Sequence, residues 1–189
     1  MKIYAVKPDS NFRLMHPEDT VYNSDHWEFK CESLAEKLPL HFQAYFSEKS
    51  DKSFPDIAWI GMSTFAFRGD VATELVEMLE DCGELLPFKV DGNTWYCLNV
   101  LQKSENSINP EKSTFEIEDG ETKFGLKKPA FIIDNLPKSA LFKIKEDNYT
   151  NIYCIDRRNT ENDIINNFFC AIAAHGYTGI KFEEVLMIK

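Results

Sequence analysis

Four carboxylates recur at helical spacing in the middle of the chain, and their type and spacing suggest a binding role. They stand at positions i, i+4, i+7 and i+11 of one predicted helix and are Asp70, Glu74, Glu77 and Asp81. Residues with this spacing share a helix face, so the four charges form one stripe. Like charges four residues apart oppose helix formation by roughly 0.2–0.5 kcal/mol per pair. We interpret the stripe either as an ordinary solvated face or as a surface for a cationic partner.

A second acidic group is expected at a hairpin turn between residues 114 and 124. The dipeptide Asp119-Gly120 favours a two-residue turn between antiparallel strands. Such a turn sets Glu118 directly opposite Glu121, which is an unfavourable pair of like charges. We therefore regard Glu118 and Glu121 as secondary candidates for contact with the same cationic partner.

The net charge of −10 is concentrated in the middle of the chain. Residues 1–68 carry a net charge of −2, residues 69–122 carry −10 and residues 123–189 carry +2. A strongly negative surface repels nucleic acid and anionic membranes and attracts basic proteins. The charge distribution favours a basic protein partner and argues against binding to nucleic acid or to a membrane.

Catalytic and metal-binding motifs are missing from the sequence. It contains no glycine-rich phosphate loop, no G-x-S-x-G, no H-E-x-x-H and no paired C-x-x-C, so we predict no enzymatic activity, no cofactor and no metal site. Five polar residues near the N-terminus match no ligand spacing that we recognise: His16, Glu18, Asp19, Asp25 and His26. An enzyme would require Cys97, His175 and Glu184 to converge in a concave pocket.

The cysteines and the N-terminal residues indicate the cellular compartment of the protein. The five cysteines are odd in number and stand mostly in apolar patterns: Cys31, Cys82, Cys97, Cys154 and Cys170. They are expected to be free thiols in a reducing compartment. The first residues lack the apolar core of a signal peptide, and no apolar run reaches the about 18 residues of a membrane span. We expect a cytoplasmic protein.

One helix must position the acidic stripe. Its opposite face is apolar, with period-3.6 spacing of Val71, Leu75, Met78, Leu79 and Cys82. Asp70 is expected to cap the first turn, and Gly83 is expected to end the helix in a left-handed conformation. We therefore predict one continuous helix from Asp70 to Cys82.

Strands surround this helix in the predicted fold. Residues 85–90 and 94–101 are β-prone and flank Asp91-Gly92, which predicts a hairpin. Further strands are expected at residues 2–7, 40–46, 114–124, 130–134, 141–145, 152–156 and 180–188, and further helices at residues 32–38 and 160–175. The predicted fold class is α+β, with a mixed, mainly antiparallel sheet built from hairpins and a few packed helices. We expect an N-terminal α/β subregion at residues 1–60 and a C-terminal unit at residues 61–189, packed together as one body.

Six short segments in the C-terminal two thirds of the chain follow one another in a fixed order. They are residues 84–87 (ELLP), 95–101 (WYCLNVL), 109–113 (NPEKS), 131–134 (FIID), 141–144 (LFKI) and 176–183 (GYTGIKFE). Together they resemble a family of bacterial immunity proteins encoded beside polymorphic, contact-delivered toxins, also catalogued as a domain of unknown function. The resemblance covers about residues 60–189 and departs from the family pattern at Asn109 and Lys143, where an acidic residue and an arginine are expected. It implies toxin neutralisation and supplies no catalytic residues.

Three hypotheses follow for the function. The first is a cytoplasmic immunity protein that binds and neutralises a basic toxin through the acidic stripe. The second is an enzyme, or an accessory of an enzyme, with an unrecognised site. The third is a structural module that forms homodimers or larger homo-oligomers through exposed aromatic residues, for example Trp27 or Trp59.

Overall fold

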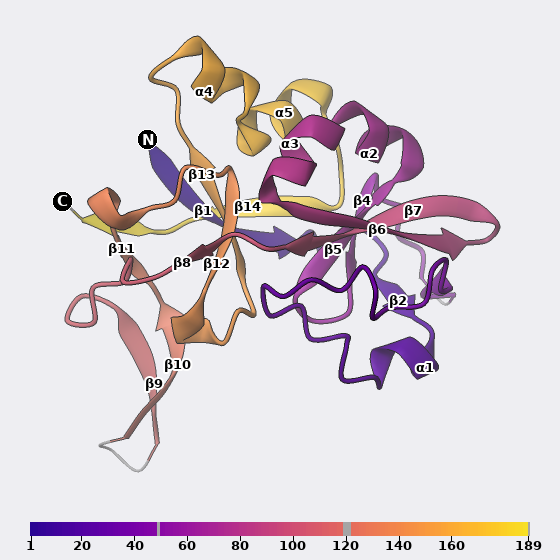
Figure 1. Cartoon of the computed structure of the whole chain (residues 1–189), viewed down its shortest axis with the longest axis horizontal. Helices are drawn as coiled ribbons and strands as arrows, with labels where there is room; N and C mark the ends of the chain where they lie inside the picture. The colour runs from indigo at the N-terminus through magenta and orange to yellow at the C-terminus, as the bar shows by residue number, and fades with distance from the viewer. Residues whose placement is uncertain (49, 119–121, 189) are drawn as a thin grey trace.

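Two large β-sheets, two pairs of strands and a layer of helices make up the described part of the protein, which Figure 1 shows as a computed structural model. The structure describes residues 1–48, 50–118 and 122–188. The sheets are mixed and mostly antiparallel, with 20% of residues in helices and 40% in strands, which confirms the predicted α+β class. In the described part of the chain, no helix combines the length and the apolar character needed to cross a membrane.

The first sheet has five strands with the N-terminal strand near its middle. In spatial order these are β14 (Ile180–Glu184), β1 (Lys2–Pro8), β13 (Ile152–Asp156), β12 (Leu141–Ile144) and β8 (Lys103–Ser104). Strand β1 pairs antiparallel with β13 on one side and with β14 on the other. The N-terminal residues therefore hold together two strands from the C-terminal part of the chain.

The second sheet has six strands and closes on itself. In spatial order these are β3 (Ala44–Phe46), β2 (Met15–Pro17), β4 (Ile57–Ile60), β5 (Thr64–Arg68), β7 (Asn93–Val100) and β6 (Gly83–Val90). Its two edges meet where Gln43 forms a β-bridge with Lys89 and the Lys89 amide donates to the Phe42 carbonyl over 2.8 Å. The sheet is therefore a nearly closed barrel.

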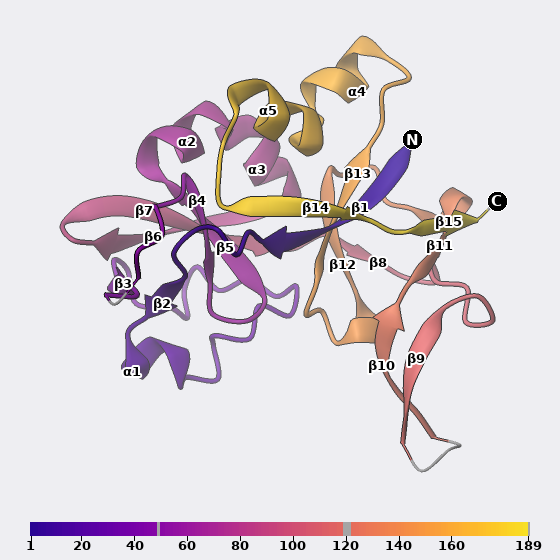
Figure 2. The ribbon, with the colours of Figure 1, turned by 180° about the vertical axis from the view of Figure 1, so that it is seen from behind.

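Four of the helices line one side of the molecule, and a hairpin extends from the other side (Figures 1 and 2). The helices are α2 (Gly69–Glu74), α3 (Val76–Cys82), α4 (Glu161–Ile165) and α5 (Phe168–His175), whereas α1 (Asp19–Tyr22) lies beside the barrel. Two short 3-10 helices are η1 (Ile133–Asn135) and η2 (Lys145–Asp147). The hairpin consists of β9 (Thr114–Glu118) and β10 (Thr122–Lys128), and β11 (Ala130–Ile132) pairs parallel with β15 (Leu186–Ile188).

Alternating side chains on the strands divide the interior into separate cores. Phe65 and Phe67 of β5 pack beneath the helices, while Ala66 between them faces the inside of the barrel. Strand β1 divides in the same way, with Tyr4 and Val6 on the helix side of the sheet and Ile3 and Ala5 on the other. Because successive residues of a strand point to opposite faces, each strand serves two cores.

The predicted hairpin around Asp91-Gly92 is confirmed. Strands β6 and β7 pair antiparallel from Gly83 opposite Val100 to Val90 opposite Asn93. Asp91 and Gly92 have φ values of 49° and 80°, as a two-residue type I′ turn requires.

The predicted continuous helix from Asp70 to Cys82 is wrong in three details. It is interrupted at Leu75, whose φ of −102° and ψ of 7° separate α2 from α3. Helix α2 begins at Gly69 directly after β5, and the Asp70 carboxylate accepts hydrogen bonds from Arg68 instead of capping the helix. Gly83 is extended, with φ of 171°, and begins β6. Glycine is required there because a Cβ would lie 1.9 Å from the Asn99 carbonyl oxygen.

The register predicted for the β9–β10 hairpin is also wrong. Glu118 pairs with Thr122 instead of Glu121. Glu121 lies outside the described residues. The predicted like-charge pair of Glu118 and Glu121 is therefore absent from the strand pairing in the described part of the hairpin.

Three other elements differ from their predictions. Residues 32–38 form a single turn closed by the Lys37 amide and the Leu34 carbonyl, because the preceding loop is bound to Glu84. The strand predicted at residues 40–46 is limited to β3. The helix predicted at residues 160–175 is divided into α4 and α5 at Asn166 and Asn167, since Asn167 caps a new helix.

Candidate partner-binding face

All four carboxylates of the predicted stripe are exposed on α2 and α3. The apolar side chains between them are buried beneath the helices, as their spacing predicts: Val71, Leu75, Met78, Leu79 and Cys82. The apolar face of α2 and α3 is buried against β5, β7 and β12. The opposite face, with Asp70, Glu74, Glu77 and Asp81, is therefore exposed to solvent. Two of the four carboxylates are bound by neighbouring side chains and two are not.

Asp70 belongs to an ion-pair network at the start of α2. Arg68 Nε and Nη2 donate to its two carboxylate oxygens over 2.7 and 3.0 Å, and Arg68 Nη1 donates to Asp56 over 2.7 Å. The hydrogen bond from Arg68 lowers the pKa of Asp70. Burial raises the pKa of Asp56, but hydrogen bonds from Thr178 and Arg68 outweigh burial and lower it. Asp70 is therefore anchored and its charge is largely balanced.

Glu74 is bound to the last residue of α5 and to a tyrosine just after that helix. The Tyr177 hydroxyl donates to its Oε2, and His175 Nδ1 lies 3.3 Å from its Oε1. Burial, together with the hydrogen bond to Glu74, raises the pKa of Tyr177 to about 12. This contact ties α2 to the C-terminal end of α5, so Glu74 has a structural role on the face.

The carboxylates of α3 carry the uncompensated charge. Glu77, Glu80 and Asp81 are exposed, and no described residue forms a hydrogen bond or ion pair with their carboxylates. Glu80 was not among the predicted contact residues, although the absence of lysine and arginine between Asp70 and Phe88 already indicated its charge. The carboxylates without partners on this face therefore belong to α3, next to a network at the start of α2 in which Arg68 offsets the charge of only one of two carboxylates, Asp56 and Asp70.

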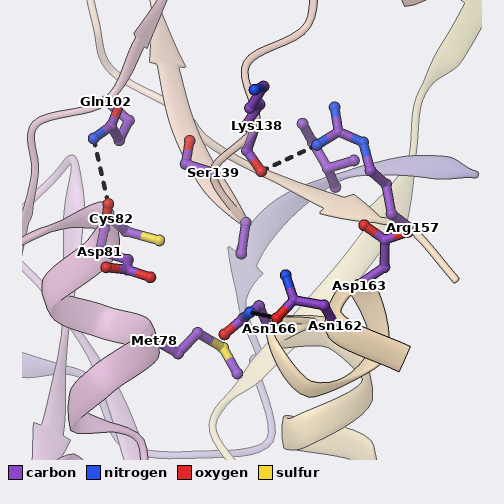
Figure 3. Close-up of a pocket in the computed structure, with 12 residues that line it drawn as sticks. Met78, Asp81, Cys82, Gln102, Lys138, Ser139, Arg157, Asn162, Asp163 and Asn166 are labelled. Atoms are coloured by element: carbon purple, nitrogen blue, oxygen red, sulfur yellow. Dashed lines mark hydrogen bonds between the residues drawn. The ribbon is translucent and has the colours of Figure 1, made fainter. Parts of the chain in front are cut away.

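A cleft of about 380 Å³ adjoins α3 at Asp81 (Figure 3). Helix α3 forms one wall, α4 forms the opposite wall, and Lys138 and Ser139 lie at a third side. Met78 and Cys82 contribute apolar surface to it. Asp81 thus belongs both to the acidic face of α3 and to the lining of the cleft.

Several polar groups of the cleft are already engaged within the protein. Arg157 donates to the carbonyls of Lys138 and Pro137 over 3.0 and 2.7 Å, and Asp163 accepts from the Thr160 amide over 3.0 Å. Burial raises the pKa of the Cys82 thiol to about 11, so this cysteine stays protonated and is unsuited to act as a nucleophile. The cleft offers hydrogen bonds and shape for binding, and its arrangement supplies no nucleophile paired with a base.

Two isoleucines beside the cleft are unusually exposed. Ile164 and Ile165 on α4 are 52% and 66% exposed. The break at Asn166 and Asn167 rotates them away from the face that α5 buries with Phe168 and Ile172. Exposed apolar side chains of this kind are typical of a protein-binding surface.

The secondary acidic candidates lie away from this face. Glu118 ends β9 in the hairpin that extends from the opposite side of the molecule (Figure 1), and Glu121 lies outside the described residues. The structure therefore does not gather Glu118 with the carboxylates of α3.

The residues considered for catalysis have separate sets of partners. Cys97 is fully buried inside the barrel, His175 contacts Glu74 and Tyr177, and Glu184 forms an ion pair with Lys2 over 2.7 Å. The convergence that an enzyme would require is not observed.

Within the described residues, no three histidine, cysteine, aspartate or glutamate side chains are grouped to hold a metal ion. The five cysteines are all free.

The aromatic residues considered for self-association are covered. Trp27 packs inside the barrel against Phe29 and Phe42, and its indole nitrogen would lie 2.5 Å from a Cβ at position 61. Gly61 is therefore required for this packing. Trp59 is half-buried against the core beneath the helices. The expectation that Trp27 is exposed is wrong, because the loop between α1 and β3 folds over the barrel.

No protein-family model matches the chain, and a comparison with curated proteins finds no similar sequence.

Proposed function

We propose that this protein is a cytoplasmic immunity protein that binds a basic toxin through α3 and the adjoining cleft and covers the toxin's working surface. The observation that carries the proposal is the set of three exposed, unpaired carboxylates on α3: Glu77, Glu80 and Asp81. The six ordered segments that resemble the immunity family support the same assignment.

The negative charge of this face should speed its association with a basic partner. Toxins that act on nucleic acid have basic working surfaces, and a face of opposite charge steers them into contact. Steering can raise association rate constants toward ~10⁸–10⁹ M⁻¹s⁻¹ at low salt. Asp70 and Glu74 contribute less, because Arg68 forms an ion pair with Asp70 and the Tyr177 hydroxyl already donates to Glu74.

The apolar residues beside α3 supply the other component of a stable interface. Charged rims mainly set the association rate, whereas buried apolar anchors hold the complex together. Ile164 and Ile165 lie on α4, which forms the far wall of the cleft that begins at Asp81. A partner that covers both helices would bury these isoleucines and bring its cations to the α3 carboxylates.

Charge reversal on α3 tests the proposal. The immobilised wild-type chain is used to isolate a partner from a lysate of the source cells, and association with the purified partner is then measured by stopped flow at several salt concentrations. We expect Glu77→Lys with Asp81→Lys to slow association about tenfold or more and to flatten its salt dependence.

A matched double variant controls for net charge. Asp19→Lys with Glu116→Lys changes the charge by the same amount at exposed positions on α1 and β9, on the other side of the molecule from α3 (Figure 1), and it is expected to leave association within about twofold of wild type. Circular dichroism checks that both variants are folded. If the captured partner is not basic, if no partner is captured, or if both variants slow association equally, the proposal is wrong.

A further inference from the structure

A second cleft lies on the other side of the molecule from the helices, at the base of the β9–β10 hairpin. It encloses about 410 Å³ between β1, β10 and the segment that joins β14 to β15. Clefts of this size suit small organic ligands. This cleft shares no residue with the cleft beside α3, so any role that it has is separate from the proposed toxin contact.

The charge lining this cleft is opposite to that of the protein as a whole. Four lysines line it in a chain whose net charge is −10: Lys7, Lys112, Lys127 and Lys128. Lys7 donates to the neutral side-chain oxygen of Asn151, and no described carboxylate forms an ion pair with any of the four. Lysines gathered without counter-charges repel one another, and an anionic ligand would relieve that repulsion.

The carboxylates in the lining do not balance these lysines. Glu183 and Glu184 also line the cleft, but Glu183 is paired with Lys181 over 3.0 Å and Glu184 with Lys2 over 2.7 Å. Neither Lys181 nor Lys2 belongs to the lining. The cleft therefore keeps a net positive charge after its internal ion pairs are counted.

One wall of the cleft is apolar. Leu126, Val185 and Leu186 line it, and Leu186 is 56% exposed. Tyr153 also lines it, but its hydroxyl donates to Asp147 over 2.9 Å and is thereby engaged in the interior. A ligand would thus meet positive charge at the lysines and an apolar surface beside them.

We propose that this cleft binds a small organic anion whose phosphate or carboxylate group contacts the lysines and whose apolar part lies against Leu126 and Leu186. Charge alone would select any anion, and the apolar wall alone would select any hydrocarbon. The two together select an amphiphilic acid. Lys127 and Lys128 line the cleft from β10, where the pairing with β9 is irregular, and Lys7 lines it from β1.

Four probes separate the two parts of the proposed recognition. Octyl phosphate and octanoate carry both the anion and the chain, inorganic phosphate carries the charge alone, and octan-1-ol carries the chain alone. Each is titrated into the full chain and followed by amide chemical shifts in two-dimensional NMR. We expect at least one of the two amphiphilic acids to bind at least about tenfold more tightly than inorganic phosphate and octan-1-ol. The tighter of the two shows whether phosphate or carboxylate is preferred.

Lysine variants locate the site. Lys127→Gln with Lys128→Gln should weaken binding of the preferred acid about tenfold, because two contacts with its anion are lost. Lys52→Gln with Lys103→Gln removes the same charge at exposed positions outside the cleft and should leave the affinity unchanged. The proposal is overturned if neither acid binds, if octan-1-ol or inorganic phosphate binds as tightly, or if the two double variants have equal affinity.

Discussion

At the scale of single residues, the most unusual feature is a lysine in the interior. Lys143 is completely buried, and its Nζ donates to the Phe29 carbonyl over 2.8 Å and to the Ser63 carbonyl over 2.9 Å. It joins β12 to the loop before β3 and to the turn between β4 and β5. Burial is the main cause that lowers its pKa from 10.5 to about 8. The two carbonyls offset part of the cost of placing a charge there.

The free energy of unfolding should therefore increase with pH between about pH 8 and pH 10.5. The pKa of Lys143 is about 8 in the folded protein and 10.5 when unfolded, so between these values the unfolded chain binds the additional proton. Raising the pH through this window should favour the folded state by ~3 kcal/mol from this group. Below about pH 8 the full cost of burying the charge remains. We expect Lys143→Met to remove this contribution, as measured by urea unfolding between pH 7.5 and 10.5.

A comparison between variants isolates the effect from other groups that titrate at high pH. Buried tyrosine and cysteine side chains are present in both proteins, so the difference in unfolding free energy between wild type and Lys143→Met reports on Lys143 together with its electrostatic coupling to Cys31 and Cys97. Lys103→Met on the neighbouring strand β8 is the control, because Lys103 is exposed. A wild-type minus Lys143→Met difference that stays constant with pH would contradict the assignment.

At the scale of elements, the break between α4 and α5 shapes the proposed interface. The buried Asn167 accepts from the Cys170 amide over 3.0 Å and donates to Asp156 and to the Arg157 carbonyl, each over 2.8 Å. Helix α4 has its own cap, since Thr160 and Asp163 form a reciprocal capping box. Two separate caps keep the helices from merging and leave Ile164 and Ile165 on the surface.

The two caps should differ in their contribution to stability. Thr160→Ala removes an exposed cap and should lower the free energy of unfolding by about 1 kcal/mol. Asn167→Ala also leaves buried groups without partners and should lower it by about 3 kcal/mol. Urea unfolding monitored by circular dichroism measures both. Equal losses would show that the buried contacts of Asn167 add nothing to its capping role.

At the scale of the whole molecule, strands from the first sixty residues complete both sheets. Strand β1 lies between β13 and β14, and β4 pairs with β5. Strand pairing thus crosses the predicted boundary at residue 60, and the division into two regions stays a prediction. The resemblance to immunity proteins covers only the part beyond that boundary, yet the helices of that part pack on residues from both sides of it, including Tyr4, Val6 and Ile57.

A fragment tests whether the C-terminal region is independent. Residues 61–189 lack β1 and β4, so the edges of β14 and β13 and one side of β5 would have no partner strands. Unpaired edges expose backbone groups and apolar faces to solvent. We expect the fragment to show poor amide dispersion in NMR and to aggregate, and we expect the full chain to be monodisperse with well-dispersed amide signals. A folded, soluble fragment would establish residues 61–189 as a separate domain.

The sequence by itself determined the features that depend on a few neighbouring residues. The turn at Asp91-Gly92, the left-handed Gly176 at the end of α5, the buried stripe of Val71 to Cys82 and the exposure of its opposite carboxylates follow from backbone preferences and periodicity. These are confirmed because the responsible interactions lie within one element.

Only the tertiary structure decided the features that depend on distant contacts. The break at Leu75, the extended Gly83 facing Asn99, the burial of Lys143 and the closure of the barrel at Gln43 and Lys89 each need a partner from another element. The two clefts are likewise formed by segments far apart in the chain. Local propensity is weak compared with the free energy of long-range packing, so it could not specify these features.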